Sequence, residues 1–451
     1  MKKICLFVFV VLSIISCREE ATDVTCYGYY SIMPLDGTAM EEAKKSPSAQ
    51  FLAFWTAMNC NYHMWDYEET FGIDWDDVLN RYLPIFQEFD QRVKDGGNIS
   101  DDELKNVYEE IVSLLHDGHL VLSINNYWMP NSLLVLNYII PQRNRVCKRK
   151  EAMSDSLPFM KHDYQHLKYY YTVAEDNPNR MVEHKELADS TAKKWYSSYG
   201  TYFYDYWAFS HAFGCFPDNI VYVRVKDFTL DKSLNPSSIY YNYSYSEKIR
   251  EWWHKWFEKV QTLHEDGKLR GMIVDLRSNS GGDANDHKYL LGALQTSGNN
   301  VFQVGWQRVK NGIGRLDYTG KMPFLLDTYP EAHASITEPI VVLVNSYTGS
   351  MAEVSSLVAK QMDNAIVMGT TTWGGMCPLP DDYEYTYSGT VGSFGGPFYI
   401  YMPAYTFYTM DDMILESKGI EPDIYVPFNV ELYNSTGRDS QLERALEYLR
   451  R

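Results

Sequence analysis

The sequence lacks the features that mark metal, redox and nucleic-acid sites. None of its seven cysteines forms a C-x-x-C pair, so the spacing predicts neither a structural zinc site nor a redox dithiol. The formal net charge is -18 and both signs are interspersed, which leaves no basic stripe for nucleic-acid recognition. Neither a G-x-x-x-x-G-K-[ST] loop nor a G-x-G-x-x-G loop occurs. We therefore expect no metal, no cofactor and no nucleic-acid partner.

The chain also lacks an apolar run long enough to cross a bilayer near its N-terminus. Lys2 and Lys3 precede an apolar run at residues 4–15, which is shorter than the ~20 residues that a span requires. This pattern is typical of a signal peptide. The run ends at Ser16 and Cys17, a site that resembles the lipobox of bacterial lipoproteins. That resemblance implies lipidation of Cys17 and a place in the cell envelope, at the outer membrane facing the periplasm or the cell surface. An ordinary secretory signal with a chance cysteine stays open.

Hydrophobic periodicity divides the rest of the chain. After a polar tether at residues 18–46, helical spacing interrupted by Gly72 and by Gly96-Gly97 predicts a helical bundle within residues 47–128. Residues 131–199 contain no glycine and little periodicity, and we expect an irregular insertion over residues 129–218. Short β-rich runs then alternate with helical ones, which predicts an α/β domain at residues 219–451.

Within the α/β domain, apolar runs predict the individual elements. Strands are expected at residues 219–230, 270–277, 339–345, 365–371, 397–408 and 423–427. Helices are expected at residues 246–267, from Asn285 and from Ser350.

Two strand-to-helix turns are candidate sites. The strand at 271–276 runs into a turn that contains Gly281 and Gly282, where unpaired backbone N–H groups can face an anion. A plain connection between a strand and a helix fits the same residues. In the second turn, Ser350 stands at the start of a helix. The S-x-x-E spacing to Glu353 is that of a capping box, but an exposed serine followed by the Met351 N–H is also what a nucleophile with an oxyanion hole needs.

A serine nucleophile needs a base, and the nearby sequence offers none. Between Ala334 and Ser417 the only lysine or histidine is Lys360, ten residues into the helix and thus ~15 Å along its axis. The base must therefore come from a distant segment. His119 stands out because it follows Gly118 in a tight turn between a helix and an apolar strand, although a lone histidine in a turn can equally be structural.

Taken in order, these pieces resemble peptidase family S41, which includes tail-specific peptidases, the tricorn core protease and retinoid-binding relatives. The resembling segments are D-G-H at 117–119, D-L-R-x-N-x-G-G at 275–282, T-G-S-M-A-E at 348–353, G-T-T-T-W-G at 369–374 and G-I-E-P-D at 419–423. The resemblance implies a crotonase/ClpP-like core of β-α units with Ser350 as nucleophile. It also implies that Met351, with Gly281 or Gly282, supplies the oxyanion N–H groups.

The identity of the catalytic base differs between branches of that family, and this chain resembles one branch more than the other. Tail-specific peptidases carry a lysine base after the glycine-threonine motif, but Gly374-Gly375-Met376 stands there. The chain therefore resembles the tricorn-like branch, whose base corresponds to His119 and whose acid corresponds to Glu416. In tricorn a serine precedes the histidine, whereas Gly118 does here, and no carboxylate-binding loop of a PDZ domain is recognisable.

The expected function is a serine peptidase that cleaves peptide or polypeptide substrates through an acyl-enzyme. Two alternatives stay open, because related folds also carry other functions. One is a non-catalytic binding protein, and the other is an esterase or amidase for small substrates. The sequence leaves the oligomeric state and the cleavage specificity open.

Overall fold

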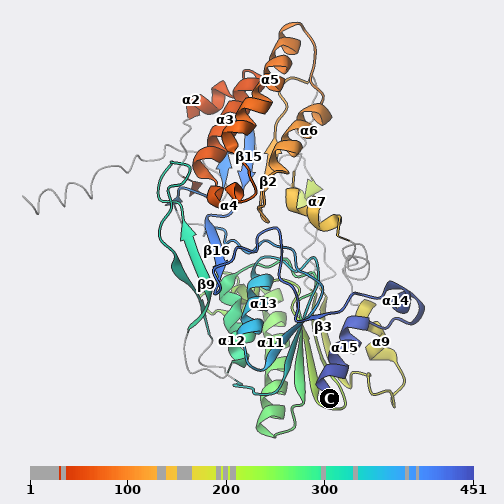
Figure 1. Ribbon diagram of the computed structural model, residues 1–451. Coiled ribbons are helices and arrows are strands. Elements are labelled where there is room, and N and C mark those ends of the chain that lie inside the picture. Colours follow the sequence, from red (N-terminus) through yellow and green to blue (C-terminus); the bar gives the residue numbers. More distant parts are fainter. Residues whose placement is uncertain are drawn as a thin grey trace, which may run out of the picture.

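A computed structural model describes residues 30–31, 37–129, 139–149, 165–188, 195–196, 202–203, 210–295, 301–328, 334–380, 385–392 and 396–451 (Figure 1). The expected signal peptide, Cys17 and Cys26 lie outside the described residues. Within those ranges, no helix is long and apolar enough to cross a membrane.

A seven-stranded mixed sheet forms the centre of the fold. Its order is β17 (Ile424–Tyr425), β12 (Ala365–Gly369), β11 (Ile340–Val344), β8 (Gly271–Asp275), β7 (Ile220–Arg224), β6 (Ser210–Cys215) and β3 (Glu183–Ala188). The strands from β17 to β7 are parallel, and β6 and β3 are antiparallel. Every residue of β7, β8 and β11 is buried, as expected for parallel strands that are covered on both faces.

Helices cover both faces of the central sheet (Figure 1). On one face, Val274 and Val342 join a core with the tryptophans of α11 (Ser244–Glu265) and with apolar residues of α13 (Met351–Gln361). On the other face, Ile273 and Val341 pack with α15 (Ser440–Leu449) and α9 (Gln165–Thr172). Alternate residues of each strand thus serve opposite cores.

The N-terminal region is helical, as the periodicity predicts. It comprises α3 (Pro47–Asn61), α4 (Trp65–Glu69), α5 (Trp75–Lys94) and α6 (Asp101–Val112). One further helix, α2 (Gly37–Glu42), precedes them within the range expected to be a polar tether. Ser46, Asp74 and Ser100 cap α3, α5 and α6 with their side chains. Gly72 and Gly96 adopt φ of +76° and +81°, which explains why glycine interrupts the helical pattern at these two places.

Two smaller antiparallel sheets connect this helical region with the central sheet. One has the order β14 (Val391–Gly392), β15 (Phe398–Tyr401) and β2 (Val121–Ile124); the other has β10 (Met322–Asp327), β9 (Val301–Val309) and β16 (Tyr405–Thr409). Because β2 follows His119 directly and pairs with β15, the turn at His119 is fixed against a C-terminal strand.

The remaining elements are short. They are β1 (Tyr30–Ser31) paired with β13 (Tyr385–Thr386), β4 (Trp195–Tyr196) paired with β5 (Tyr202–Phe203), α7 (Pro141–Cys147), α10 (Leu230–Leu234), the 3-10 helix η1 (Ala284–Tyr289), α12 (Leu291–Leu294) and α14 (Val430–Thr436).

Several element predictions differ from the structure. The strand expected at 219–230 is β7, which ends at Arg224, and Leu230 begins α10. The strand expected at 397–408 is two strands, β15 and β16, in different sheets; they separate at Pro403, which has no N–H to donate to a ladder. The helix expected from Asn285 is only η1 and the four-residue α12. Strands β3 and β6, from the range expected to be an irregular insertion, extend the central sheet beyond the range 219–451.

Candidate active site

Ser350 lies at a sharp turn between the buried strand β11 and the helix α13. Its backbone has φ +53° and ψ -127°, a conformation that residues with a side chain rarely adopt. A helix-capping serine has ordinary extended dihedrals, so capping alone does not require this strain. A strained strand-to-helix turn is instead the geometry that exposes the hydroxyl of a nucleophilic serine.

Glu353, one turn into α13, holds this serine turn in place. Its buried carboxylate accepts the N–H groups of Ser350 at 3.1 Å, Gly374 at 2.7 Å and Gly375 at 2.8 Å, and also the Thr372 hydroxyl. Burial raises the pKa of Glu353, and these hydrogen bonds oppose that rise. The capping-box glutamate therefore also fixes the loop that follows β12.

The two strand-to-helix turns predicted from the sequence lie against each other. The Ser278 N–H donates to Asn345 Oδ1 at 2.8 Å, and the Gly349 N–H donates to the Asn279 carbonyl at 2.9 Å. Gly281 has φ +96°, and a Cβ added to it would lie 2.5 Å from the Ser350 Cβ. Only glycine fits this position, because both the conformation and the close approach exclude a side chain.

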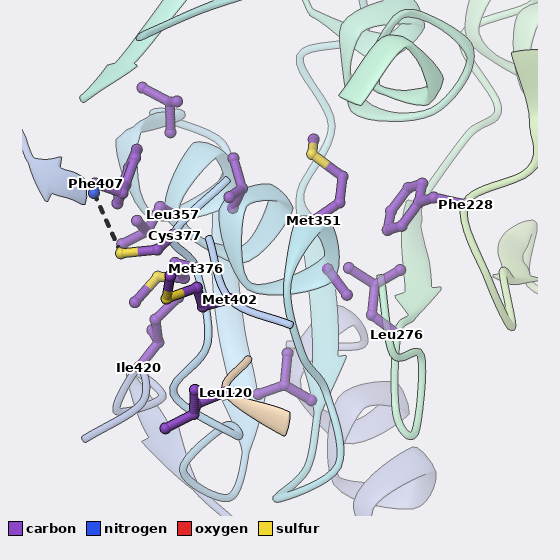
Figure 2. Close-up of a cluster of buried hydrophobic side chains, with 14 of the residues drawn as sticks. Leu120, Phe228, Leu276, Met351, Leu357, Met376, Cys377, Met402, Phe407 and Ile420 are labelled. Carbon is purple, nitrogen blue, oxygen red and sulfur yellow. Dashed lines mark hydrogen bonds between the residues drawn. The ribbon is translucent and has the colours of Figure 1, made fainter. Parts of the chain in front are cut away.

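The predicted oxyanion donors differ in how their N–H groups are engaged. Met351 is the first residue of α13, where an N–H has no acceptor within the helix. Its side chain is buried in the cluster that also contains Phe228 and Leu276 (Figure 2). The Gly281 N–H donates to Asn279 Oδ1 at 2.8 Å. A Cβ on Gly282 would lie 2.2 Å from the Phe228 carbonyl oxygen, so Gly282 packs against the segment after β7.

Asp117 shapes the turn that carries His119. Its Oδ1 accepts the N–H groups of His119 at 2.7 Å and Leu120 at 2.9 Å. Its Oδ2 lies 3.1 Å from Nε2 of His63, and both side chains are fully buried. His63, from the segment between α3 and α4, supports the turn although no pattern in the sequence indicates it.

The glycine before His119 packs on the loop after β12. A Cβ on Gly118 would lie 2.1 Å from the Gly374 carbonyl oxygen and 2.3 Å from the Gly375 Cα. Trp373 Nε1 donates to the Gly118 carbonyl at 3.0 Å. Because Glu353 holds Gly374 and Gly375, the turn of His119 is connected through this loop to the turn of Ser350.

The His119 ring has one nitrogen without a hydrogen-bond partner among the described residues and a lowered pKa. Its Nδ1 is buried and has no hydrogen-bond partner in the part of the chain that the structure describes. Burial lowers the pKa of His119, the charge of Asp117 opposes this and His63 adds to it. A histidine with a lowered pKa is neutral near pH 7 and can accept a proton.

Glu416 lies beside this turn but binds its backbone. Its Oε2 accepts the Gly118 N–H at 2.8 Å, and its Oε1 accepts the N–H groups of Met376 and Cys377, each at 2.6 Å. Among the described residues, no hydrogen bond joins Glu416 to the His119 ring. Burial, and next the charge of Asp117, raise the pKa of Glu416 to about 8. Its role as the acid partner of His119 stays a prediction.

Ser350 and His119, far apart in sequence, line one cavity of about 540 Å³. The other lining residues are Gly118, Val121, Ile140, Lys226, Ser278, Ser280, Tyr347, Gly349, Trp373, Gly375 and Tyr401. Lys360 and His116 are not among them. Lys360 pairs with Asp423, and His116 Nδ1 lies 2.8 Å from Glu68 Oε2.

Residues 219–426 match the model of Peptidase family S41, and this range contains both strand-to-helix turns of the site. This part of the chain belongs to peptidase family S41. The chain is 29% identical over 183 residues to the tricorn protease of Thermoplasma volcanium, a match that covers 40% of this chain and 15% of that protein. It is 26% identical over 168 residues to the carboxy-terminal processing protease CtpA of Bacillus subtilis, covering 37% and 30% of the two chains.

The chain spans less than a third of the length of these curated relatives. The crystal structure of a candidate peptidase from Parabacteroides merdae has the same fold over most of the molecule. That similarity has a TM-score of 0.57 with 19% identity, and it covers 90% of this chain and 97% of the other.

Lys226 also lines the cavity, and no pattern in the sequence indicated it. It follows β7, and its amine donates to the Ser278 carbonyl. Burial lowers the pKa of Lys226 to about 8, and Arg224 adds to this. Its position just after the carboxyl end of β7 is the signal that could have indicated it, because ligands in open α/β sheets bind at the carboxyl ends of the strands.

The described residues contain no group of three histidine, cysteine or acidic side chains that could hold a metal ion. Four cysteines in those ranges, Cys60, Cys147, Cys215 and Cys377, are free thiols. Burial raises the pKa of Cys377 well above its ordinary value, so this thiol beside the site is not a thiolate nucleophile.

Proposed function

We propose that the chain is a serine peptidase in which Ser350 is the nucleophile and His119 the general base. The observation that carries this proposal is the strained backbone of Ser350 at the wall of a cavity that His119 also lines. Strain of this kind costs about 1–3 kcal/mol and persists where a function needs the resulting geometry.

The reaction follows from the chemistry of these groups. His119 accepts the hydroxyl proton as Ser350 Oγ attacks the carbonyl carbon of the scissile peptide bond. The Met351 N–H stabilises the negative charge that develops on the carbonyl oxygen. His119 then gives the proton to the leaving amine, and water releases the acyl group in the reverse sequence of steps.

A second oxyanion donor comes from the turn at Gly281 and Gly282. Gly281 is closer to Ser350, but its N–H is bonded to Asn279 in the free protein. We infer that substrate binding must replace this bond before Gly281 can serve. Glu416 acts in this proposal through the Gly118 N–H, and thus orients the turn that carries the base.

Hydrolysis of a peptide library by the wild type and by Ser350→Ala tests the proposal. We expect the wild type to release fragments and Ser350→Ala to release none, while the matched surface variant Ser237→Ala keeps full activity. Hydrolysis that persists in Ser350→Ala would refute the assignment. Wild-type protein that cleaves esters but no peptide would favour the small-substrate alternative. Absence of any turnover would favour a binding protein on the same fold.

We also propose that the protein is exported and anchored through lipid on Cys17. The support is the signal-like segment at residues 1–17, which ends at Ser16 and Cys17. Wild-type protein should partition with membranes and carry acyl chains on Cys17, and Cys17→Ser should release it. Mass spectrometry that finds a mature N-terminus at Arg18, without lipid, would refute the anchor.

A further inference from the structure

We propose that Lys226 binds a carboxylate of the substrate, so that the peptidase prefers peptides with a carboxylate near the scissile bond. This inference rests on the proposed function, because it places the carboxylate in the same cavity as Ser350. It assigns a determinant of specificity to a residue that takes no part in proton transfer.

The position of Lys226 is the first observation. It follows the carboxyl end of β7 and lines the cavity together with Ser350 and His119. Its amine donates to the carbonyl of Ser278, which belongs to the glycine-rich turn beside the nucleophile. An ammonium group has three donors, so two stay available for a ligand when one is used by Ser278.

The second observation is that Lys226 has no carboxylate partner within the described ranges. No acidic oxygen there lies within the 4.0 Å of an ion pair, whereas Lys185, Lys288 and Lys360 each have one at that distance. The charges of two carboxylates, Asp227 and Asp275, act on Lys226, but both side chains bind other groups. Asp275 pairs with Arg277 at 2.6 Å, and Asp227 accepts the Thr229 hydroxyl at 2.8 Å.

The third observation is the character of the cavity. Among the described residues that line the cavity, Lys226 is the only lysine, arginine or acidic residue, and Val121, Ile140, Trp373 and Tyr401 give apolar or aromatic walls. Burial disfavours an unpaired ammonium group, which is why the pKa of Lys226 falls to about 8. The group is still mostly protonated at neutral pH. A carboxylate that enters this partly buried site forms a charge-assisted hydrogen bond, and the pair is stronger there than in water.

The carboxylate can come from two sources in a peptide. One is the side chain of an aspartate or glutamate, and the other is the free C-terminus. Both present the same planar anion to Lys226. They differ in the substrates that they select, and a pair of matched peptides separates them.

The experiment begins with a peptide that the wild type cleaves, chosen from a mixed library. Around its cleavage site, one pair of peptides differs by Glu against Gln, and a second pair by a free C-terminus against a C-terminal amide. kcat and KM are measured for the wild type, Lys226→Met, Lys226→Arg and the exposed surface control Lys248→Met.

We expect the wild type to favour the carboxylate member of one pair by about tenfold in kcat/KM, mainly through KM. The pair that shows the preference identifies the source. In Lys226→Met, kcat/KM should fall for the carboxylate member far more than for the uncharged member, so that the preference is lost. Lys226→Arg should restore part of the preference, and Lys248→Met should match the wild type.

Three results would overturn the inference. They are equal kcat/KM within both pairs in the wild type, a preference that persists in Lys226→Met, and an equal loss of kcat on charged and uncharged peptides in Lys226→Met. The last result would assign Lys226 to proton transfer or to positioning of the turn at Ser278. If Ser350→Ala is inactive in the same assays, such a result leaves the proposed function standing. If Ser350→Ala is active, the proposed function itself fails.

Discussion

At the scale of single residues, the strained backbone of Ser350 lets a stability measurement distinguish a nucleophilic serine from a helix-capping serine. Replacement by glycine should relieve φ +53° and stabilise the fold by about 1 kcal/mol, because glycine adopts this region freely. Ser350→Ala should leave the free energy of unfolding nearly unchanged. A capping serine predicts the opposite, since its loss to alanine costs ~1 kcal/mol. Urea unfolding of both variants measures the difference, and a destabilised Ser350→Ala would support the cap.

The pKa of His119 gives a second prediction at this scale. A base must be unprotonated, so kcat/KM should fall as the pH drops through the pKa of the free enzyme. Burial lowers the pKa of His119, which places the acidic limb below the ordinary value of 6.5. The exposed variant His254→Ala should keep this profile, and His119→Ala should lose turnover by orders of magnitude. A limb near 8 would instead point to Lys226 or Glu416, whose pKa values both lie there.

At the scale of elements, the contact between the turn at 117–119 and the loop after β12 governs the site. Gly118→Ala places a Cβ 2.1 Å from the Gly374 carbonyl oxygen, so one backbone must move. We expect Gly118→Ala to lose most of its kcat, because the movement shifts His119 away from Ser350. Gly320→Ala is the matched control, since its Cβ would meet nothing within 4 Å. Full activity of folded Gly118→Ala would show that this contact does not position the base.

The same elements show which features local sequence patterns could predict and why the others could not be predicted. Strands β8 and β11 are continuous apolar runs that end in glycine or serine turns, so periodicity locates both turns and the start of α13. The break at Pro403 and the short η1 depend on packing against other sheets, which no local window contains. The sequence did not indicate His63 and Lys226 as site residues for the same reason. Each is an isolated polar residue whose partners, Asp117 and the Ser278 carbonyl, are distant in sequence.

For the candidate residues, local patterns and resemblance contributed differently. The S-x-x-E spacing predicts the bond between Ser350 and Glu353, but the added bonds from Gly374 and Gly375 to Glu353 come from the tertiary fold. Sequence spacing alone gives no reason to place His119 and Ser350 in one site, and only the family resemblance predicted that they share one. That Glu416 binds the Gly118 N–H was not foreseen, because a carboxylate that contacts backbone leaves no motif.

At the scale of the whole molecule, the site needs both the helical region and the central sheet. His119 follows α6, and Ser350 follows a central strand of the sheet (Figure 1). Pairing of β2 with β15 holds the two parts together, and Gln50 Nε2 supports this with bonds to the carbonyls of Asn125 and Pro397 at 2.8 and 2.9 Å. Catalysis in this account is therefore a property of the assembled chain.

The most direct test of this account locates the covalent adduct of a fluorophosphonate probe on the full-length protein. Such probes react with a serine that a neighbouring base activates. Peptide mapping by mass spectrometry should place the adduct on Ser350 in the wild type. Labelling should be absent in Ser350→Ala, much slower in His119→Ala and unchanged in His254→Ala. An adduct on another serine, or labelling of folded His119→Ala at the wild-type rate, would contradict the claim that Ser350 and His119 form the catalytic pair.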